Sequence, residues 1–164
     1  MQKFLTKRNN KGVFIIAGIM LAIMIIAFIV SKFFYQLLLI RGESMSPTYH
    51  NLQLTILDKR VDEYVTGDVV AFKCDGVEHL LIKRIVACPG DRVCITDGEL
   101  HVNGEVPAEY IDRVFNYAGL LKDEIHLEEG QYIVIGDNIE KSRDSRYEEV
   151  GIVLQENLLG RVIW

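Results

Sequence analysis

The sequence lacks the short motifs that mark common metal sites. Its three cysteines, Cys74, Cys88 and Cys94, form no C-x-x-C pair, and its four histidines form no H-E-x-x-H motif. We therefore expect no metal and no organic cofactor. An odd cysteine count defines no disulfide framework either. The favoured interpretation is three small buried hydrophobic side chains, and a Cys88–Cys94 bridge outside the cell stays open.

The chain also lacks a surplus of basic residues. It has 18 Lys and Arg against 23 Asp and Glu, a formal net charge of −5. No basic stripe is present, so no nucleic-acid partner is expected. Internal repeats and low-complexity segments are absent from the sequence as well, and 164 residues suit one modest domain plus an additional segment.

One long run is free of charge. Val13–Val30 reads VFIIAGIMLAIMIIAFIV, and at about 1.5 Å per residue such a helix nearly crosses a hydrocarbon core of about 30 Å. Aromatic residues at Phe33, Phe34 and Tyr35 extend the run and suit the membrane interface. We therefore predict one transmembrane anchor over residues 13–37.

Two alternatives for this run are weaker. The run is longer than the apolar region of about 7–15 residues of a cleaved signal peptide, and no A-x-A-like site follows it. A buried core helix would need more surrounding chain than remains. Four basic residues precede the run: Lys3, Lys7, Arg8 and Lys11. Because positive residues stay inside, we expect a cytoplasmic tail over residues 1–12 and a single-pass topology with residues 38–164 outside.

Beyond the anchor, β-branched and apolar runs alternate with turn signals, which predicts a mainly β, antiparallel domain. The runs expected to form strands are 52–57, 68–73, 77–87, 91–96, 99–102, 132–135 and 161–164. The turn signals are Asp75-Gly76, Asp97-Gly98 and Asn103-Gly104. The stretch 106–127 is irregular. Its aromatic residues either contact the membrane or the substrate, or pack as a surface loop.

Two residues combine into a candidate reactive pair. Ser44 lies between the turn-forming residues Gly42 and Pro47, so its hydroxyl can project from a strand end. Neither G-x-S-x-G nor S-x-x-K fits around it, which argues against an α/β-hydrolase elbow. Lys83 lies in the apolar run 80–86 and faces either solvent or a desolvated cleft beside Ser44. To act as a base near pH 7–8, its pKa must fall by about 2.5–3.5 from about 10.4, which burial can supply.

Three motifs, taken in order, resemble those of bacterial type I signal peptidases, in the small form typical of Gram-positive bacteria. They are Ser44-Met45-x-Pro47-Thr48, Lys83-Arg84-Ile85-x-x-x-Pro89-Gly90-Asp91 and Gly136-Asp137-Asn138-x-x-x-Ser142-x-Asp144-Ser145-Arg146. The resemblance covers the anchor and nearly all of the domain beyond it. It implies a signal-peptidase-like antiparallel β catalytic domain and a membrane-bound serine endopeptidase, a hydrolase that removes signal peptides after a small-x-small stretch.

The resemblance also implies roles for single residues. Ser44 would be the nucleophile and Lys83 the general base, and Ser142 would hydrogen-bond and orient the lysine. The supporting network would comprise Asp144, Arg146, Asp137 and Arg84. The substrate groove would be lined by the strands leading into Ser44 and Lys83: Leu38, Leu39, Ile40 and Gly42, with Leu80, Leu81 and Ile82. An extended peptide can pair with such strands and place alternate side chains in shallow pockets.

One departure concerns Gly42, because many Gram-negative members of the family carry there a serine that donates to the oxyanion, whereas members from Gram-positive bacteria often have glycine. The oxyanion hole would then depend on backbone N–H, chiefly that of Ser44, and a substitute donor is expected. The expected partners are exported preproteins, the lipid bilayer and the secretion translocon, at the bacterial cell membrane.

Two other functions compete. A self-cleaving repressor-type Ser-Lys protease is disfavoured by the anchor and by the lack of a DNA-binding helical segment. A non-catalytic, membrane-tethered protein with a protease-like β fold is disfavoured by the intact Ser44, Lys83 and Ser142.

Overall fold

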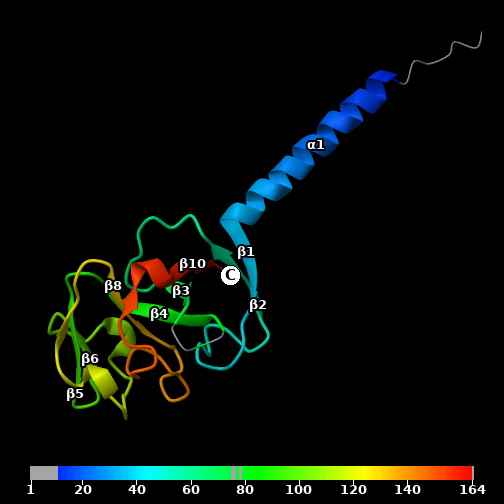
Figure 1. The fold of residues 1–164 in the computed structure, drawn as a ribbon. Helices are drawn as coiled ribbons and strands as arrows, with labels where there is room; N and C mark the ends of the chain where they lie inside the picture. Colours follow the sequence, from blue (N-terminus) through cyan, green and yellow to red (C-terminus); the bar gives the residue numbers. More distant parts are fainter. Residues whose placement is uncertain (1–10, 75–76, 78, 164) are drawn as a thin grey trace, which may run out of the picture. The chain divides into compact units, whose positions relative to one another are not determined.

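The structure is a computed structural model that describes residues 11–74, 77 and 79–163. It divides into two compact units, with the division between Phe34 and Tyr35 (Figure 1). The proposed basic tail up to residue 10, the turn signal Asp75-Gly76 and the C-terminal Trp164 lie outside the described residues.

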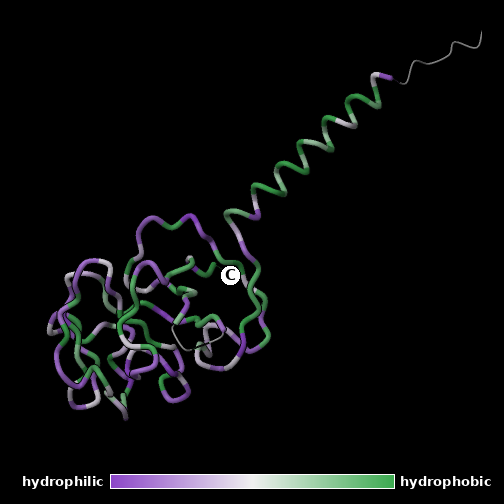
Figure 2. Tube along the Cα trace, in the orientation of Figure 1, coloured by the Kyte–Doolittle hydropathy of each residue, from purple (hydrophilic) through white to green (hydrophobic). Residues whose placement is uncertain are grey.

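Helix α1, Lys11–Phe34, is the first unit's described element. It is apolar along nearly its whole length (Figure 2), and by length and composition it could cross a membrane. It ends at Phe34, three residues before the boundary that we expected for the anchor. Residues 35–37 belong instead to strand β1, Tyr35–Leu39, where Tyr35 pairs with Asp58. That pairing gives their backbone groups partners within a sheet, so the helix does not continue.

The second unit consists mainly of two antiparallel sheets, as the sequence predicted. The larger has the strand order β1-β2-β10-β3-β4-β8-β9 and the smaller β6-β5-β7. The remaining strands are β2 Leu54–Asp58, β3 Val69–Phe72, β4 Leu81–Ala87, β5 Arg92–Thr96, β6 Glu99–Val102, β7 Ile125–His126, β8 Gln131–Ile135, β9 Val153–Leu154 and β10 Leu158–Ile163. Three short 3-10 helices complete the unit: η1 Ala108–Tyr110, η2 Gly119–Lys122 and η3 Gln155–Asn157.

Each of the seven predicted runs overlaps a strand, but 77–87 becomes regular only from Leu81. Strands β7 and β9 have two residues each, too few to show a period of two. Strand β1 continues the apolar composition of α1, so no change of composition marks its start. The turns at Asp97-Gly98 and Asn103-Gly104 have positive φ at both residues, as a two-residue hairpin of type I′ requires.

The irregular stretch 106–127 packs against the domain. Tyr110, Phe115 and Leu121 are buried in one hydrophobic cluster with residues of β5, β6 and β8. Of the two alternatives for this stretch, the packed one therefore describes these three side chains. Four other large side chains of the stretch are exposed: Ile111, Val114, Tyr117 and Leu120.

Cys74, Cys88 and Cys94 form no disulfide with one another, so the open alternative of a Cys88–Cys94 bridge does not occur in the structure. Each is partly rather than fully buried, which is less burial than the sequence interpretation assumed.

Candidate active site

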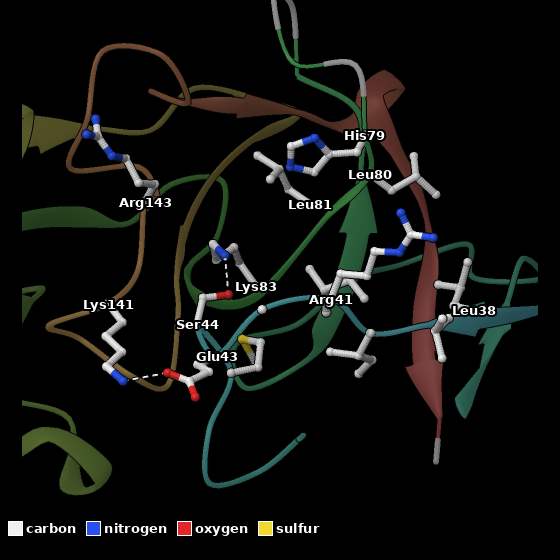
Figure 3. A pocket seen from close by; sticks show the side chains of 15 residues that line it. Leu38, Arg41, Glu43, Ser44, His79, Leu80, Leu81, Lys83, Lys141 and Arg143 are labelled. Carbon is white, nitrogen blue, oxygen red and sulfur yellow. Dashed lines mark hydrogen bonds and ion pairs between the residues drawn. The ribbon is translucent and has the colours of Figure 1, made fainter. Parts of the chain in front are cut away.

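Strand β4 and the turn after β1 bring together the two residues of the candidate pair, which are 39 positions apart. Lys83 Nζ lies 2.7 Å from Ser44 Oγ, within hydrogen-bond distance. The two side chains point toward one another in Figure 3. When the amine is neutral, it can accept the proton of this hydroxyl, which is the contact that a serine nucleophile needs for activation.

Lys83 faces a desolvated cleft rather than solvent. Its strand lies inside the larger sheet, between β3 and β8, and only 4% of the residue is exposed. Burial lowers the pKa of Lys83 to about 8, with a smaller effect in the opposite direction from Asp144. A lysine with this pKa is uncharged in a substantial fraction of molecules near neutral pH, because burial disfavours its charged form.

The turn that carries Ser44 is anchored on both sides of the serine. Met45 is 1% exposed and packs in a cluster with Leu57 and Val69. On the other side, the N–H of Gly42 donates to Asn51 Oδ1 at 2.9 Å. Gly42 has φ of +93°, a conformation that side-chain-bearing residues rarely adopt, so the backbone itself favours glycine here.

The N–H of Ser44 forms no hydrogen bond with any described residue. It is therefore available to an oxyanion next to the nucleophile, and no side chain at residue 42 can assist it. The substitute donor that we expected is not identified by the contacts of the described residues.

Asp144 and Arg146 form a buried ion pair. Arg146 Nε and Nη2 donate to the two oxygens of Asp144 at 2.8 and 2.9 Å, and the two side chains are 2% and 0% exposed. The same groups close the loop after β8, since Gly136 N–H donates to Asp144 Oδ2 and Arg146 Nη2 to the carbonyl of Ile139. Removing one partner of such a buried pair typically costs about 3–5 kcal/mol.

Asp137 links three segments around the site. Its carboxylate accepts hydrogen bonds from Arg84 Nε and Nη2 at 2.8 and 2.6 Å, and also from the hydroxyl of Thr48. Arg84 follows Lys83 on β4, and Thr48 lies in the turn of Ser44. The carbonyl of Asp137 accepts from Arg113 Nη1 at 2.8 Å, so the stretch 106–127 contributes one contact to this network. Nothing in the sequence around Arg113 indicates that contact.

Ser142 is 2% exposed, and its hydroxyl has no hydrogen-bond partner among the described residues. The bond to Lys83 that the family resemblance implies is thus not formed here, and the orienting role of Ser142 stays a prediction. The side chain lies against Gly136: a Cβ there would come within 2.2 Å of Ser142 Oγ and 2.5 Å of the Ser44 carbonyl oxygen.

A groove of about 450 Å³ opens beside Ser44 and Lys83. The seven residues expected to contact substrate all line it: Leu38, Leu39, Ile40, Gly42, Leu80, Leu81 and Ile82. Six further residues line the groove and were not predicted from the sequence: Arg41, Glu43, Met45, His79, Lys141 and Arg143. Their only signal in the sequence was proximity, since most are neighbours of Ser44 or Ser142 along the chain.

A buried lysine in contact with a serine, at a groove between strand segments, is typical of serine hydrolases that use lysine in place of histidine and act on extended peptides. Comparison with known proteins agrees with this class. A family model described as signal peptidase, peptidase S26, matches residues 13–164.

Individual relatives give the same result. Signal peptidase I of Bacillus licheniformis is 28% identical over 166 residues, which cover 94% of this chain and 88% of that protein. Signal peptidase IB of Staphylococcus aureus is 30% identical over 158 residues, covering 84% and 81%. A signal peptidase I from Enterococcus faecalis has a crystal structure similar in fold, with a TM-score of 0.52 and 24% identity, covering 63% of this chain and 99% of that one.

The chain therefore belongs to the signal peptidase family, peptidase S26. Its function is that of a membrane serine endopeptidase, which removes signal peptides from preproteins.

Proposed function

We propose that this signal peptidase cuts its substrates with Ser44 as nucleophile and Lys83 as general base. The observation that carries the proposal is the 2.7 Å contact between Lys83 Nζ and Ser44 Oγ, made by a lysine that is 4% exposed. Ser44 Oγ forms a bond to the scissile carbonyl carbon while Lys83 takes the hydroxyl proton. The lysine then gives that proton to the leaving amine, and an acyl-enzyme remains.

Water completes the reaction by the same route. Lys83 takes a proton from the attacking water and returns it to Ser44 Oγ as the ester bond breaks, which releases the signal peptide with a free carboxylate. During both steps the N–H of Ser44 donates to the oxyanion, because preorganised donors stabilise charge that develops in the transition state. Asp137, Arg84, Asp144 and Arg146 hold the surrounding segments and do not react.

The groove supports cleavage after a small-x-small stretch. Strand β1 is at the edge of the larger sheet, where an extended peptide can add by backbone hydrogen bonds. The residues next to this edge and next to Lys83 are aliphatic, among them Leu38, Ile40 and Ile82. Aliphatic walls give shallow apolar pockets, which suit small side chains at the first and third positions before the cut.

The same proposal includes the topology at the bacterial cell membrane. Residues 1–12 are cytoplasmic, 13–37 contain the anchor, and 38–164 form the extracytoplasmic catalytic domain. The charge of the flanks supports this orientation, because the basic residues are concentrated before the apolar run. The partners are then the lipid bilayer, exported preproteins and the secretion translocon that delivers them.

The pH dependence of cleavage should show one basic limb. Because the pKa of Lys83 is lowered to about 8 by burial, kcat/KM should rise about tenfold per pH unit below this value and level off above it. The measurement is kcat/KM on one preprotein from pH 5.5 to 9.5. A rate that does not change across this range would contradict a titrating lysine base.

Replacing Ser142 by alanine tests whether this residue orients Lys83 without contributing to the stability of the fold. We expect Ser142→Ala to lower kcat by roughly 10–100-fold, since a misplaced base reacts slowly. Thermal unfolding should change little, because the hydroxyl has no partner to lose. Steady-state kinetics and circular dichroism test the two halves, and a variant with unchanged kcat would remove Ser142 from the mechanism.

The proposed function is tested by incubating the detergent-solubilised protein with a preprotein and reading the cut site by mass spectrometry. The expected result is one cut after a small-x-small stretch, absent with Ser44→Ala. Cleavage that persists in the folded Ser44→Ala protein would refute the dyad. Several preproteins left uncut by the folded unmodified protein would favour the non-catalytic alternative.

A further inference from the structure

The groove has two chemically different ends. In Figure 3, Ser44 lies between a mainly aliphatic side, which holds Leu38 and Leu80 with Arg41 between them, and a charged group formed by Glu43, Lys141 and Arg143. We call these three residues the charged rim. Glu43 directly precedes Ser44, and Lys141 directly precedes Ser142, so the charged rim is set by the same turns that hold the two serines.

The direction of the substrate follows from the proposed function, on which this inference rests. Residues before the cut lie along the aliphatic end, and the scissile bond lies at Ser44. The chain after the cut must then leave past the opposite end. Because the substrate continues there into a mature protein, its first residues downstream of the cut have to pass the charged rim.

The two cations of the charged rim keep hydrogen-bond donors that no described residue uses. Lys141 Nζ donates to Glu43 Oε2, and the pKa of Glu43 is lowered by that hydrogen bond and by the lysine charge. Arg143 Nη1 donates to Glu149 at 2.9 Å, and its guanidinium lies 4.9 Å from the ring centroid of Tyr147. An ammonium has three N–H donors and a guanidinium five, so each cation can donate to a further acceptor.

The charged side chains that line the groove are mostly basic, whereas the whole chain has more acidic residues than basic ones. The chain has a formal net charge of −5, yet among the described residues Arg41, Lys141 and Arg143 line the groove and Glu43 is the acidic residue that lines it. Lys141 and Arg143 are 60% and 70% exposed at their side chains, so a passing peptide can reach them. Because Lys141 is paired with Glu43 and Arg143 with Glu149, the attraction for a substrate carboxylate comes from the remaining donors of these cations rather than from a net field.

We propose that Lys141 and Arg143 are specificity-determining residues that contact the substrate downstream of the cut and favour an acidic side chain at its first or second position. An aspartate or glutamate there accepts hydrogen bonds from the free donors of these two residues. A lysine or arginine in the same place cannot accept these hydrogen bonds and lies beside two cations.

The test measures binding without turnover. The solubilised Ser44→Ala protein is titrated with three versions of one preprotein, carrying Glu, Gln or Lys at the second residue after the cut. We expect the Glu version to bind about fivefold more tightly than the Lys version, the effect of one exposed ion pair. This ratio should fall at 0.5 M salt, because salt screens exposed charges.

The decisive variant is Lys141→Gln/Arg143→Gln in the Ser44→Ala protein, for which the ratio should fall to near one. The matched control is Arg92→Gln/Lys122→Gln, which removes the same charge at exposed side chains outside the groove. The control should keep the fivefold ratio. Two results would overturn the proposal. One is a Glu-to-Lys affinity ratio near one in the protein without rim substitutions, and the other is a fivefold ratio that persists in Lys141→Gln/Arg143→Gln.

The proposed function is tested by a separate cleavage measurement. Cleavage of the Gln version by the protein with Ser44 intact reports on the dyad alone. Binding to the Ser44→Ala protein needs no dyad, so a charge preference can be found or lost whether or not cleavage occurs.

Discussion

Lys83→Met should abolish cleavage while making the protein more stable at neutral pH. The rate should fall by about 10²–10⁴-fold, the contribution of a general base, since methionine has nearly the shape of lysine but cannot accept a proton. The measurement is kcat/KM on one preprotein above pH 8, where the unmodified Lys83 is largely neutral. Turnover of the variant at the unmodified rate would exclude Lys83 as the base.

The gain in stability follows from the sign of the pKa shift. The pKa of Lys83 falls from 10.5 to about 8 because of burial, so between these values the unfolded chain binds more protons than the folded one. Burying the ammonium therefore destabilises the fold fully below pH 8, and this penalty disappears as the pH rises to about 10.5. A shift of this size corresponds to about 3 kcal/mol, reduced by the lost contact with Ser44.

Thermal unfolding of the solubilised protein at pH 7 and pH 10 tests this sign. Lys83→Met should unfold at a higher temperature than the unmodified protein at pH 7, with a smaller difference at pH 10. The control is Lys122→Met, whose side chain is 73% exposed and should show no such difference. A Lys83→Met protein that is less stable at pH 7 and unchanged at pH 10 would contradict the burial of a charge.

Gly136→Ala should cost both stability and activity. A Cβ at this position would lie 2.5 Å from the carbonyl oxygen of Ser44 and 2.2 Å from Ser142 Oγ. The first is a backbone atom, which cannot move aside alone, so the two serine-bearing segments must separate. Overpacking of this kind costs about 1–3 kcal/mol, and a displacement of about 1 Å at a nucleophile can cost about 10²-fold in rate.

The matched control for Gly136→Ala is Gly104→Ala. Gly104 has open space around its Cβ position but a φ of +84°, so alanine there strains the backbone by about 1–3 kcal/mol without approaching the groove. We expect similar losses of stability in both variants, and a loss of kcat only in Gly136→Ala. Equal kcat in the two would show that the close approach of Gly136 does not position Ser44.

The apolar helix and most strands could be predicted because their signals are local. A charge-free run of helical length and runs bounded by Asp-Gly and Asn-Gly depend on neighbouring residues alone. Local signals failed where an element is too short, as in β7, or where composition does not change, as at Tyr35. At Tyr35 the end of the helix is set by sheet pairing, because Tyr35 pairs with Asp58 of strand β2.

The order of the residue types was enough to place a serine in a turn, a lysine in an apolar run, and a later loop with Ser142, Asp144 and Arg146. It left open which way Lys83 points, since a strand offers one face to solvent and one to the core. Tertiary structure decided that question, and it alone brought Arg113 to Asp137 and Lys141 to Glu43. The physical reason is that desolvation and contact depend on segments far apart in the chain, which no local pattern records.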